Sequence, residues 1–151
     1  MISATVVLET MGSHEWVQKL SWHHIEKLAK LAEERSFEPG EVLFQQGDRA
    51  DRFYVIVSGT VGMALPGRAN SFIAQVVTAC EEIGWDALIE EGVRCFTAKA
   101  MTPVRAVVFN GPELLAECER DPQFGFLLMK HLLRVVSERL DASRLQVLIR
   151  S

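Results

Sequence analysis

Apolar residues recur at helical spacing near the start of the chain, between residues 15 and 36. The apolar positions there are Trp16, Leu20, Ile25, Leu28, Leu31 and Ala32, and charged side chains lie among them. Steps of about three or four residues place such positions on one face of a helix. Ser21 divides the run and is a good N-cap residue, so the pattern predicts two short helices that meet near Ser21. Residues 1–14 precede them as an N-terminal extension.

Helical spacing returns in residues 111–150. Pro112 suits the first turn of a short helix, while Asp121 and Pro122 suit the cap and the first residue of another. No proline follows Pro122 and no glycine follows Gly125, which predicts one long helix or two abutting helices up to the C-terminal end. The apolar stripe of this region comprises Phe126, Met129, Leu133, Val136, Leu140 and Val147.

The segment from residue 37 to residue 110 has short apolar runs separated by turn residues. The runs cover residues 42–44, 53–57, 61–65, 72–77, 96–100 and 104–109, and the turns include Pro39-Gly40, Gly47-Asp48, Ser58-Gly59 and Pro66-Gly67. Several short strands at regular spacing predict a barrel or a sandwich. Residues 85–89 follow Gly84 and do not alternate, so they are expected to form a short helix within the β region. The N-terminus of such a helix can bind an anion, because its first amide groups have no partner within the helix.

Composition and charge place the chain among soluble globular proteins. It has 151 residues, of which 48% are hydrophobic and 24% charged, as expected for one domain with its own core. A net charge of -4 argues against a generally basic nucleic-acid binder. The first ten residues contain no Lys or Arg, unlike a signal peptide, and no run approaches the ~18 apolar residues of a membrane span. Cys80, Cys95 and Cys118 lack paired spacing and are expected to be reduced thiols of a cytoplasmic protein.

No residue pattern points to catalysis or to a metal site. Residues 37–109 contain no histidine, so metal-dependent barrel chemistry would lack its ligands, and no nucleophile–base arrangement stands out. His23 and His24 are adjacent, whereas a metal-binding pair on one helix face needs a spacing of about three or four residues. His131 has no carboxylate at matching spacing on both sides and is interpreted as structural. The chain is therefore predicted to be no enzyme, with no catalytic residues and no metal site.

Residues 37–59 carry a longer and more specific pattern. It runs Phe37-x-x-Gly40-Glu41-x-Leu43-Phe44-x-x-Gly47-Asp48-x-Ala50-Asp51-x-Phe53-Tyr54-x-Ile56-x-Ser58-Gly59. With the flanking helices and the short inner helix, this pattern resembles the cyclic nucleotide-binding domain family, in particular the sensor domain of the bacterial catabolite-activator/fumarate-nitrate regulators. The resemblance implies an α+β fold over residues 15–151. Its expected core is an antiparallel β-roll (a jelly-roll-like double-stranded β-helix), flanked by N-terminal helices and a long C-terminal helix.

In the family that this chain resembles, the short inner helix carries a phosphate-binding cassette. The opening of the cassette is matched by Gly84, Trp85, Asp86 and Ala87, and the arginine segment that follows is matched by Arg94, Cys95 and Phe96. The resemblance implies that Arg94 and nearby backbone amides hold the cyclic phosphate of cAMP or cGMP, with no other cofactor. Trp85 stands where the family has a ribose-binding glutamate, and Phe96 stands where a small residue is usual. Asp86 is one position from that glutamate and is expected to point elsewhere.

Two functions are open at this point. The first is a regulatory, sensory module that binds a cyclic nucleotide or another small anion near Arg94 and signals through its C-terminal helix. The second is a protein-interaction or dimerisation module that keeps the fold and has lost the ligand. Arg94 could instead be a surface residue paired with Glu90 or Glu91, and Trp85 could fill the pocket or stack on a flat ligand. Losing one charge-assisted hydrogen bond of about 1.5–3 kcal/mol weakens binding by about tenfold to a hundredfold without excluding it.

The apolar residues of the C-terminal helix indicate which kind of partner to expect. Its many apolar residues beyond Leu140 favour a homodimer seam, or a contact with another protein, over a wholly solvated helix. Transcription factors of the resembling family continue into a helix-turn-helix after this helix, and the sequence ends at Ser151, so no direct nucleic-acid contact is expected. No membrane contact is expected either.

Overall fold

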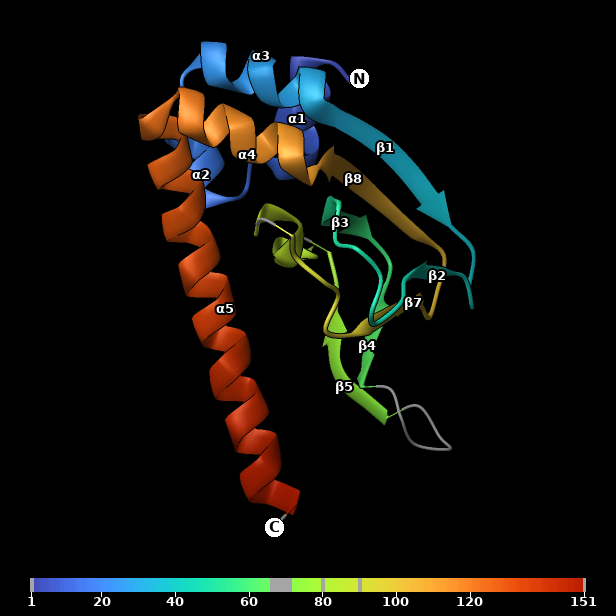
Figure 1. Cartoon of the computed structure of the whole chain (residues 1–151). Coiled ribbons are helices and arrows are strands. Elements are labelled where there is room, and N and C mark those ends of the chain that lie inside the picture. The colour runs from blue at the N-terminus through green and yellow to red at the C-terminus, as the bar shows by residue number, and fades with distance from the viewer. Residues whose placement is uncertain (1, 66–71, 80, 90, 151) are drawn as a thin grey trace.

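The chain consists of helices at both ends and strands between them, as the computed structural model shows (Figure 1). The structure describes residues 2–65, 72–79, 81–89 and 91–150, with the backbone alone for residue 65, residues 72–75 and residues 141–150. The helices are α1 (Ala4–Met11), α2 (Glu15–Gln18), α3 (Trp22–Leu31), the short 3-10 helix η1 (Trp85–Leu88), α4 (Gly111–Arg120) and α5 (Pro122–Arg150). The strands are β1 (Ala32–Phe37), β2 (Val42–Phe44), β3 (Arg52–Ser58), β4 (Val61–Leu65), β5 (Phe72–Val77), β6 (Glu82–Ile83), β7 (Thr97–Ala100) and β8 (Val104–Asn110). Among the described helices, none combines the length and the apolar character that a membrane crossing requires.

The strands form two four-stranded antiparallel sheets. Their orders are β1-β8-β3-β6 and β2-β7-β4-β5. The expected α+β fold, an antiparallel β-roll between N-terminal helices and a long C-terminal helix, is thereby confirmed. In the first sheet the short strand β6 pairs with β3 through Tyr54 and Ile83, and the chain passes from β6 directly into η1. This pairing fixes the position of the predicted inner helix against the sheet.

Two apolar clusters stabilise this arrangement. The larger joins the helices to one face of the first sheet and includes Met11, Trp16, Leu28, Phe53, Phe109, Leu114, Phe124 and Leu128. The smaller fills the roll between the two sheets and includes Phe37, Phe44, Tyr54, Ile56, Met63, Ile83 and Val108. In Figure 1, α1, α3 and α4 gather at one end of the molecule, and α5 extends from that end past the strands. The helical layer therefore buries one side of the sheet while the roll keeps its own interior.

The N-terminal region differs from the sequence-based expectation in two places. Residues 1–14 include helix α1, whose Val7 and Met11 are fully buried in the larger cluster, so this stretch is part of the packed domain. The helices expected to reach residue 36 end at Leu31, because Ala32 begins strand β1 and pairs with Phe109 of β8. Four of the six residues of β1 are polar, and only its two end residues are buried, so apolar alternation could not reveal this strand.

The C-terminal region forms α4 and one long helix, α5, of which Pro122 is the first residue. The cap at Asp121 is confirmed, since its Oδ1 accepts a hydrogen bond from the Phe124 amide at 3.3 Å. The buried face of α5 comprises Phe124, Leu128 and Leu132. The apolar stripe identified from the sequence lies on a different face, where Phe126, Met129, Leu133 and Leu140 are exposed. The side chain of Val147 and the apolar residues beyond Leu140 lie outside the described side chains.

Candidate functional site

The candidate site begins with a sharp turn at Gly84. Gly84 has a φ of +81° and directly precedes η1. A Cβ atom at this position would lie 2.8 Å from both the Arg52 carbonyl oxygen and Arg94 Nη1. Only glycine combines this left-handed conformation with so close an approach. The turn therefore sets the peptide backbone of residue 84 against the guanidinium group of Arg94.

Backbone pairing with the turn at residues 47–50 holds Arg94 in place. The Arg94 amide donates to the Asp48 carbonyl oxygen at 2.9 Å, and the Gly47 amide donates to the Arg94 carbonyl oxygen at 2.9 Å. The Ala50 amide donates to the Gly92 carbonyl oxygen at 2.9 Å. Gly47 and its neighbours belong to the motif that carried the family resemblance, so one role of that motif is to position the arginine segment.

The side chain of Arg94 is buried, with an exposed fraction of 2%. Its Nη1 donates to Asp86 Oδ1 at 2.6 Å and to the Gly84 carbonyl oxygen at 3.2 Å, and its Nη2 donates to the Arg52 carbonyl oxygen at 2.6 Å. The guanidinium carbon also lies 4.1 Å from the centre of the Phe44 ring, a cation–π contact. The interpretation of Arg94 as a surface residue paired with Glu91 is therefore wrong, and Glu90 lies outside the described residues.

Asp86 corrects a second expectation. Its position, one residue from that of the family's glutamate, predicted that its side chain would point away from the site, whereas its carboxylate lies on Arg94 Nη1. The reason is the loop after η1, which turns back through Gly92 so closely that a Cβ there would overlap the Asp86 carbonyl oxygen. This return brings residue 94 back alongside residue 86. A buried arginine thus has an anionic partner from its own chain.

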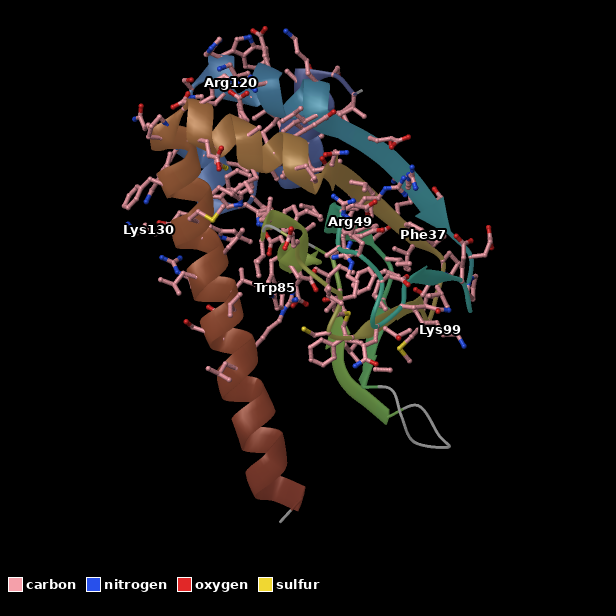
Figure 2. The ribbon with its side chains drawn as sticks, viewed as in Figure 1. Phe37, Arg49, Trp85, Lys99, Arg120 and Lys130 are labelled. Carbon is pink, nitrogen blue, oxygen red and sulfur yellow. The ribbon has the colours of Figure 1, made fainter. Side chains whose placement is uncertain are left out.

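Trp85 connects this site to the C-terminal helix. Its indole is partly buried and packs against the larger apolar cluster. The guanidinium carbon of Arg139, from α5, lies 4.7 Å from the centre of the indole ring, and Arg139 Nη2 donates to the Glu82 carbonyl oxygen. Burial lowers the pKa of Arg139 below its usual value. Figure 2 shows Trp85 in the region between η1 and α5. The residue is thus a partly buried aromatic that stacks on a cation of its own chain.

The other cassette residues lie around this centre with different surroundings. Ala87 is buried, and its carbonyl oxygen faces Gly111 so closely that a Cβ at residue 111 would overlap it. Phe96 is partly buried and packs against the cluster inside the roll. Cys95 is an exposed free thiol, and Cys118 is a buried free thiol whose pKa burial raises to about 11. The structure therefore brings Gly84, Asp86 and Arg94 together, with Trp85 facing α5. Cys80 lies outside the described residues.

One cluster of polar side chains was missed at the sequence level. Glu82 Oε1 lies 2.9 Å from His14 Nδ1 and 2.7 Å from His131 Nε2. Burial would raise the pKa of the Glu82 carboxyl, but hydrogen bonds from His131 and His14 outweigh burial and lower it to about 2. His131 thus has a carboxylate partner, contrary to the expectation from its neighbours in sequence. The three residues come from the start of α2, from β6 and from α5, so no spacing along the chain could have indicated their contact.

Comparison with known proteins identifies the class of this fold and site. A β-roll with a short inner helix is the fold of the cyclic nucleotide-binding type of domain. The chain belongs to the cyclic nucleotide-binding domain family, whose family model matches residues 34–121. The family resemblance drawn from the sequence is thereby confirmed.

Individual relatives agree with this assignment. The chain is 30% identical over 119 residues to the CRP-like cAMP-activated global transcriptional regulator of Mycobacterium tuberculosis, covering 77% of this chain and 50% of the relative. It is 32% identical over 103 residues to the cAMP-dependent protein kinase regulatory subunit of Dictyostelium discoideum, covering 62% of this chain and 32% of the relative. Among solved structures, a proposed cyclic nucleotide-binding protein from Geobacter metallireducens superimposes with a TM-score of 0.77 at 26% identity, covering 93% of this chain and 99% of that one. The chain thus spans about half the length, or less, of these two curated relatives.

Proposed function

We propose that this chain is a non-catalytic sensory module that binds a small anion at Arg94, with a cyclic nucleotide as the expected ligand. The observation that carries the proposal is the geometry of Arg94. Two backbone carbonyl oxygens and a stacked phenyl ring orient the guanidinium in a buried position. A preorganised, largely desolvated guanidinium is well suited to bind a phosphate group.

The contact between Asp86 and Arg94 is the one that a ligand would have to replace. Its carboxylate occupies Nη1 of Arg94, as the phosphate of a ligand would, and so acts as an internal stand-in for that phosphate. A cyclic phosphate can bind Arg94 fully only if it displaces Asp86, and the free energy of that ion pair is then subtracted from the binding free energy. Trp85 at the usual glutamate position removes a ribose contact as well. Both features predict weaker binding of cyclic nucleotides than a cassette without them would show.

The route of the signal follows from the same residues. Displacement of Asp86 would move η1, and η1 carries Trp85, which stacks on Arg139 of α5. Arg139 also binds the Glu82 carbonyl oxygen, two residues before the turn at Gly84. A ligand would shift the position of α5 to the extent that it binds the two arrangements of these contacts with different affinities. We therefore expect ligand binding to change the position of α5 relative to η1 and β6.

The exposed apolar stripe of α5 suggests which contact a movement of α5 would change. Phe126 and Leu133 have exposed fractions of 65% and 69%, and Met129 and Leu140 are exposed on the same face. A helix with one buried apolar face and a second, exposed one is suited to pair with another protein surface. We expect a second copy of the chain to cover it through the same stripe, giving a homodimer. Another protein is the alternative partner, and the net charge of -4 favours neither nucleic acid nor an anionic membrane surface.

A second function is favoured by one specific observation. Asp86 and two backbone carbonyl oxygens accept hydrogen bonds from Arg94, so the chain itself supplies an anionic partner to this arginine. The chain would then be a dimerisation or protein-interaction module that keeps the fold without nucleotide binding.

Calorimetric titration distinguishes the two functions. Wild type, Asp86→Ala and Glu91→Gln are each titrated with cAMP, cGMP and inorganic phosphate. We expect Asp86→Ala to bind a cyclic nucleotide about tenfold more tightly than wild type, or better, since one charge-assisted contact no longer competes. Glu91→Gln removes the same charge from an exposed position in the loop that follows η1 and should match wild type. If wild type and Asp86→Ala are folded and neither binds any of the three anions, the ligand-free module is correct.

A further inference from the structure

A cluster of two histidines and one glutamate lies apart from Arg94, at the junction of three elements. His14 precedes α2, Glu82 lies in β6, and His131 lies in α5. Glu82 has an exposed fraction of 3% and His14 of 8%, and the His131 side chain is largely buried as well. The edge of the His14 ring meets the His131 ring at a centroid distance of 5.7 Å, and Trp16 packs against His131. Three polar side chains therefore lie together in a largely buried position, with Trp16 beside them.

We propose that His14, Glu82 and His131 form a binding site for a divalent transition-metal ion of the Zn²⁺ type. Two imidazole nitrogens and one carboxylate oxygen are a ligand set that Zn²⁺ favours, with one position left for water. His14 Nδ1, Glu82 Oε1 and His131 Nε2 all lie within 4.8 Å of one another. The inference does not depend on the function proposed for Arg94.

The distances suit such an ion. Metal–ligand bonds of about 2.0–2.1 Å in tetrahedral geometry place ligand atoms about 3.3 Å apart. The two N···O separations are 2.9 and 2.7 Å, and the separation of the two nitrogens does not exceed 4.8 Å. Both N···O separations are about half an ångström shorter than this, so the side chains must move slightly apart about their own torsions to admit the ion.

The buried charge of the Glu82 carboxylate also suits a divalent metal ion. Both histidines converge on a single oxygen of a buried carboxylate, and a buried negative charge requires a paired cation or a metal.

Occupancy of this site would connect the N-terminal helices, the strand before the cassette and α5. Glu82 supplies its carboxylate to the cluster while its carbonyl oxygen accepts from Arg139. A bound ion would therefore link α5 to the Glu82 carboxylate, in addition to the hydrogen bond that links Arg139 of α5 to the Glu82 carbonyl oxygen.

The test uses the full chain, freed of metal with a chelator and then titrated with Zn²⁺ alone. We expect one ion to bind per chain and the thermal unfolding temperature to rise with Zn²⁺ concentration. Glu82→Gln and His131→Gln keep a hydrogen-bonding side chain and should each weaken binding by more than about a hundredfold. That exceeds the usual effect of changing a residue that only hydrogen-bonds to a metal ligand. The matched controls His23→Ala, at an exposed histidine, and His24→Ala, at the histidine beside Asp121, should bind Zn²⁺ as wild type does.

A spectroscopic measurement on wild type keeps the proposal falsifiable if a variant fails to fold. Co²⁺ in place of Zn²⁺ should give the intense visible absorption of a four-coordinate ion, without a sulfur-to-metal charge-transfer band. Absence of Zn²⁺ binding, a thiolate band, or a loss of binding in His23→Ala or His24→Ala would each overturn the proposal. So would unchanged binding in folded Glu82→Gln and His131→Gln, which would leave the cluster a set of hydrogen bonds only.

Discussion

Asp86 Oδ1 lies 2.6 Å from Arg94 Nη1, and the two residues are eight positions apart along the chain. The arginine that the family resemblance singled out as a phosphate ligand is thus already paired with a carboxylate. The carbonyl oxygens of Gly84 and Arg52 also accept hydrogen bonds from it. This ion pair stabilises the fold, and under the proposed function it also competes with a ligand for Arg94. Mutation is therefore expected to lower stability and, at Asp86, to strengthen ligand binding.

Arg94→Met should destabilise the domain much more than Arg105→Met. Arg94 is buried, so its loss leaves Asp86 and two carbonyl oxygens without their donor, at a cost of about 3–5 kcal/mol. Arg105 also pairs with a carboxylate, that of Glu34, but both side chains are exposed, and such a pair contributes about 0–1 kcal/mol. Urea unfolding of the two variants against wild type measures the difference. Equal losses of stability would show that the Arg94 contacts contribute little.

Gly84→Ala should destabilise more than Gly40→Ala, although both residues have positive φ angles. At Gly40, with φ of +88°, an added Cβ meets no atom within 4 Å, so only backbone strain of about 1–2 kcal/mol is expected. At Gly84 the same strain adds to a clash with the Arg52 carbonyl oxygen and with Arg94, an overpacking cost of about 1–3 kcal/mol. Thermal and urea unfolding provide the comparison. A Gly84→Ala variant no less stable than Gly40→Ala would contradict the close packing at this turn.

Leu133→Lys should convert a dimer to a monomer without unfolding the chain. Leu133 is exposed at the centre of the stripe, so a lysine there costs little in the single chain but places an unpaired charge in the proposed seam. Glu138→Gln changes the net charge by the same amount at another exposed position of α5 and is the matched control. Light scattering coupled to size-exclusion chromatography measures the mass. A wild type that is monomeric at all concentrations would show that a second copy does not cover the stripe.

Acid should destabilise the wild type more than Asp121→Asn. The hydrogen bond with His24, then that from the Phe124 amide, lower the pKa of Asp121 below its usual value. Its ionised form therefore stabilises the folded state above the unfolded-state pKa of about 3.9, and this stabilisation is lost as pH falls through the lower folded-state pKa. Asparagine keeps the cap of α5 but does not titrate. Urea unfolding between about pH 6 and about pH 3 should show a shallower acid slope for Asp121→Asn, and equal slopes would contradict the assignment.

Much of the fold was predictable because its signals are local. The turn glycines, the alternating runs and the Asp121-Pro122 start of α5 act within a few residues, and the strands at 42–44, 61–65 and 72–77 match the structure in full. Strand β1 was not predictable, since it is mostly polar and exists through pairing with β8. Helix α1 lies within the first 14 residues, and only the burial of Val7 and Met11 shows that this helix belongs to the core.

The sequence by itself determined the family, the β-roll, and Gly84 and Arg94 as the centre of the candidate site. These depend on residue types at short, regular separations, which a single chain displays directly. Only the tertiary structure decided that Asp86 neutralises Arg94, that Arg139 stacks on Trp85, and that His14, Glu82 and His131 meet. The first contact requires a loop to double back, and the others join elements up to 117 positions apart, from His14 to His131. Such contacts depend on the packing of whole elements against one another, which local propensity does not encode.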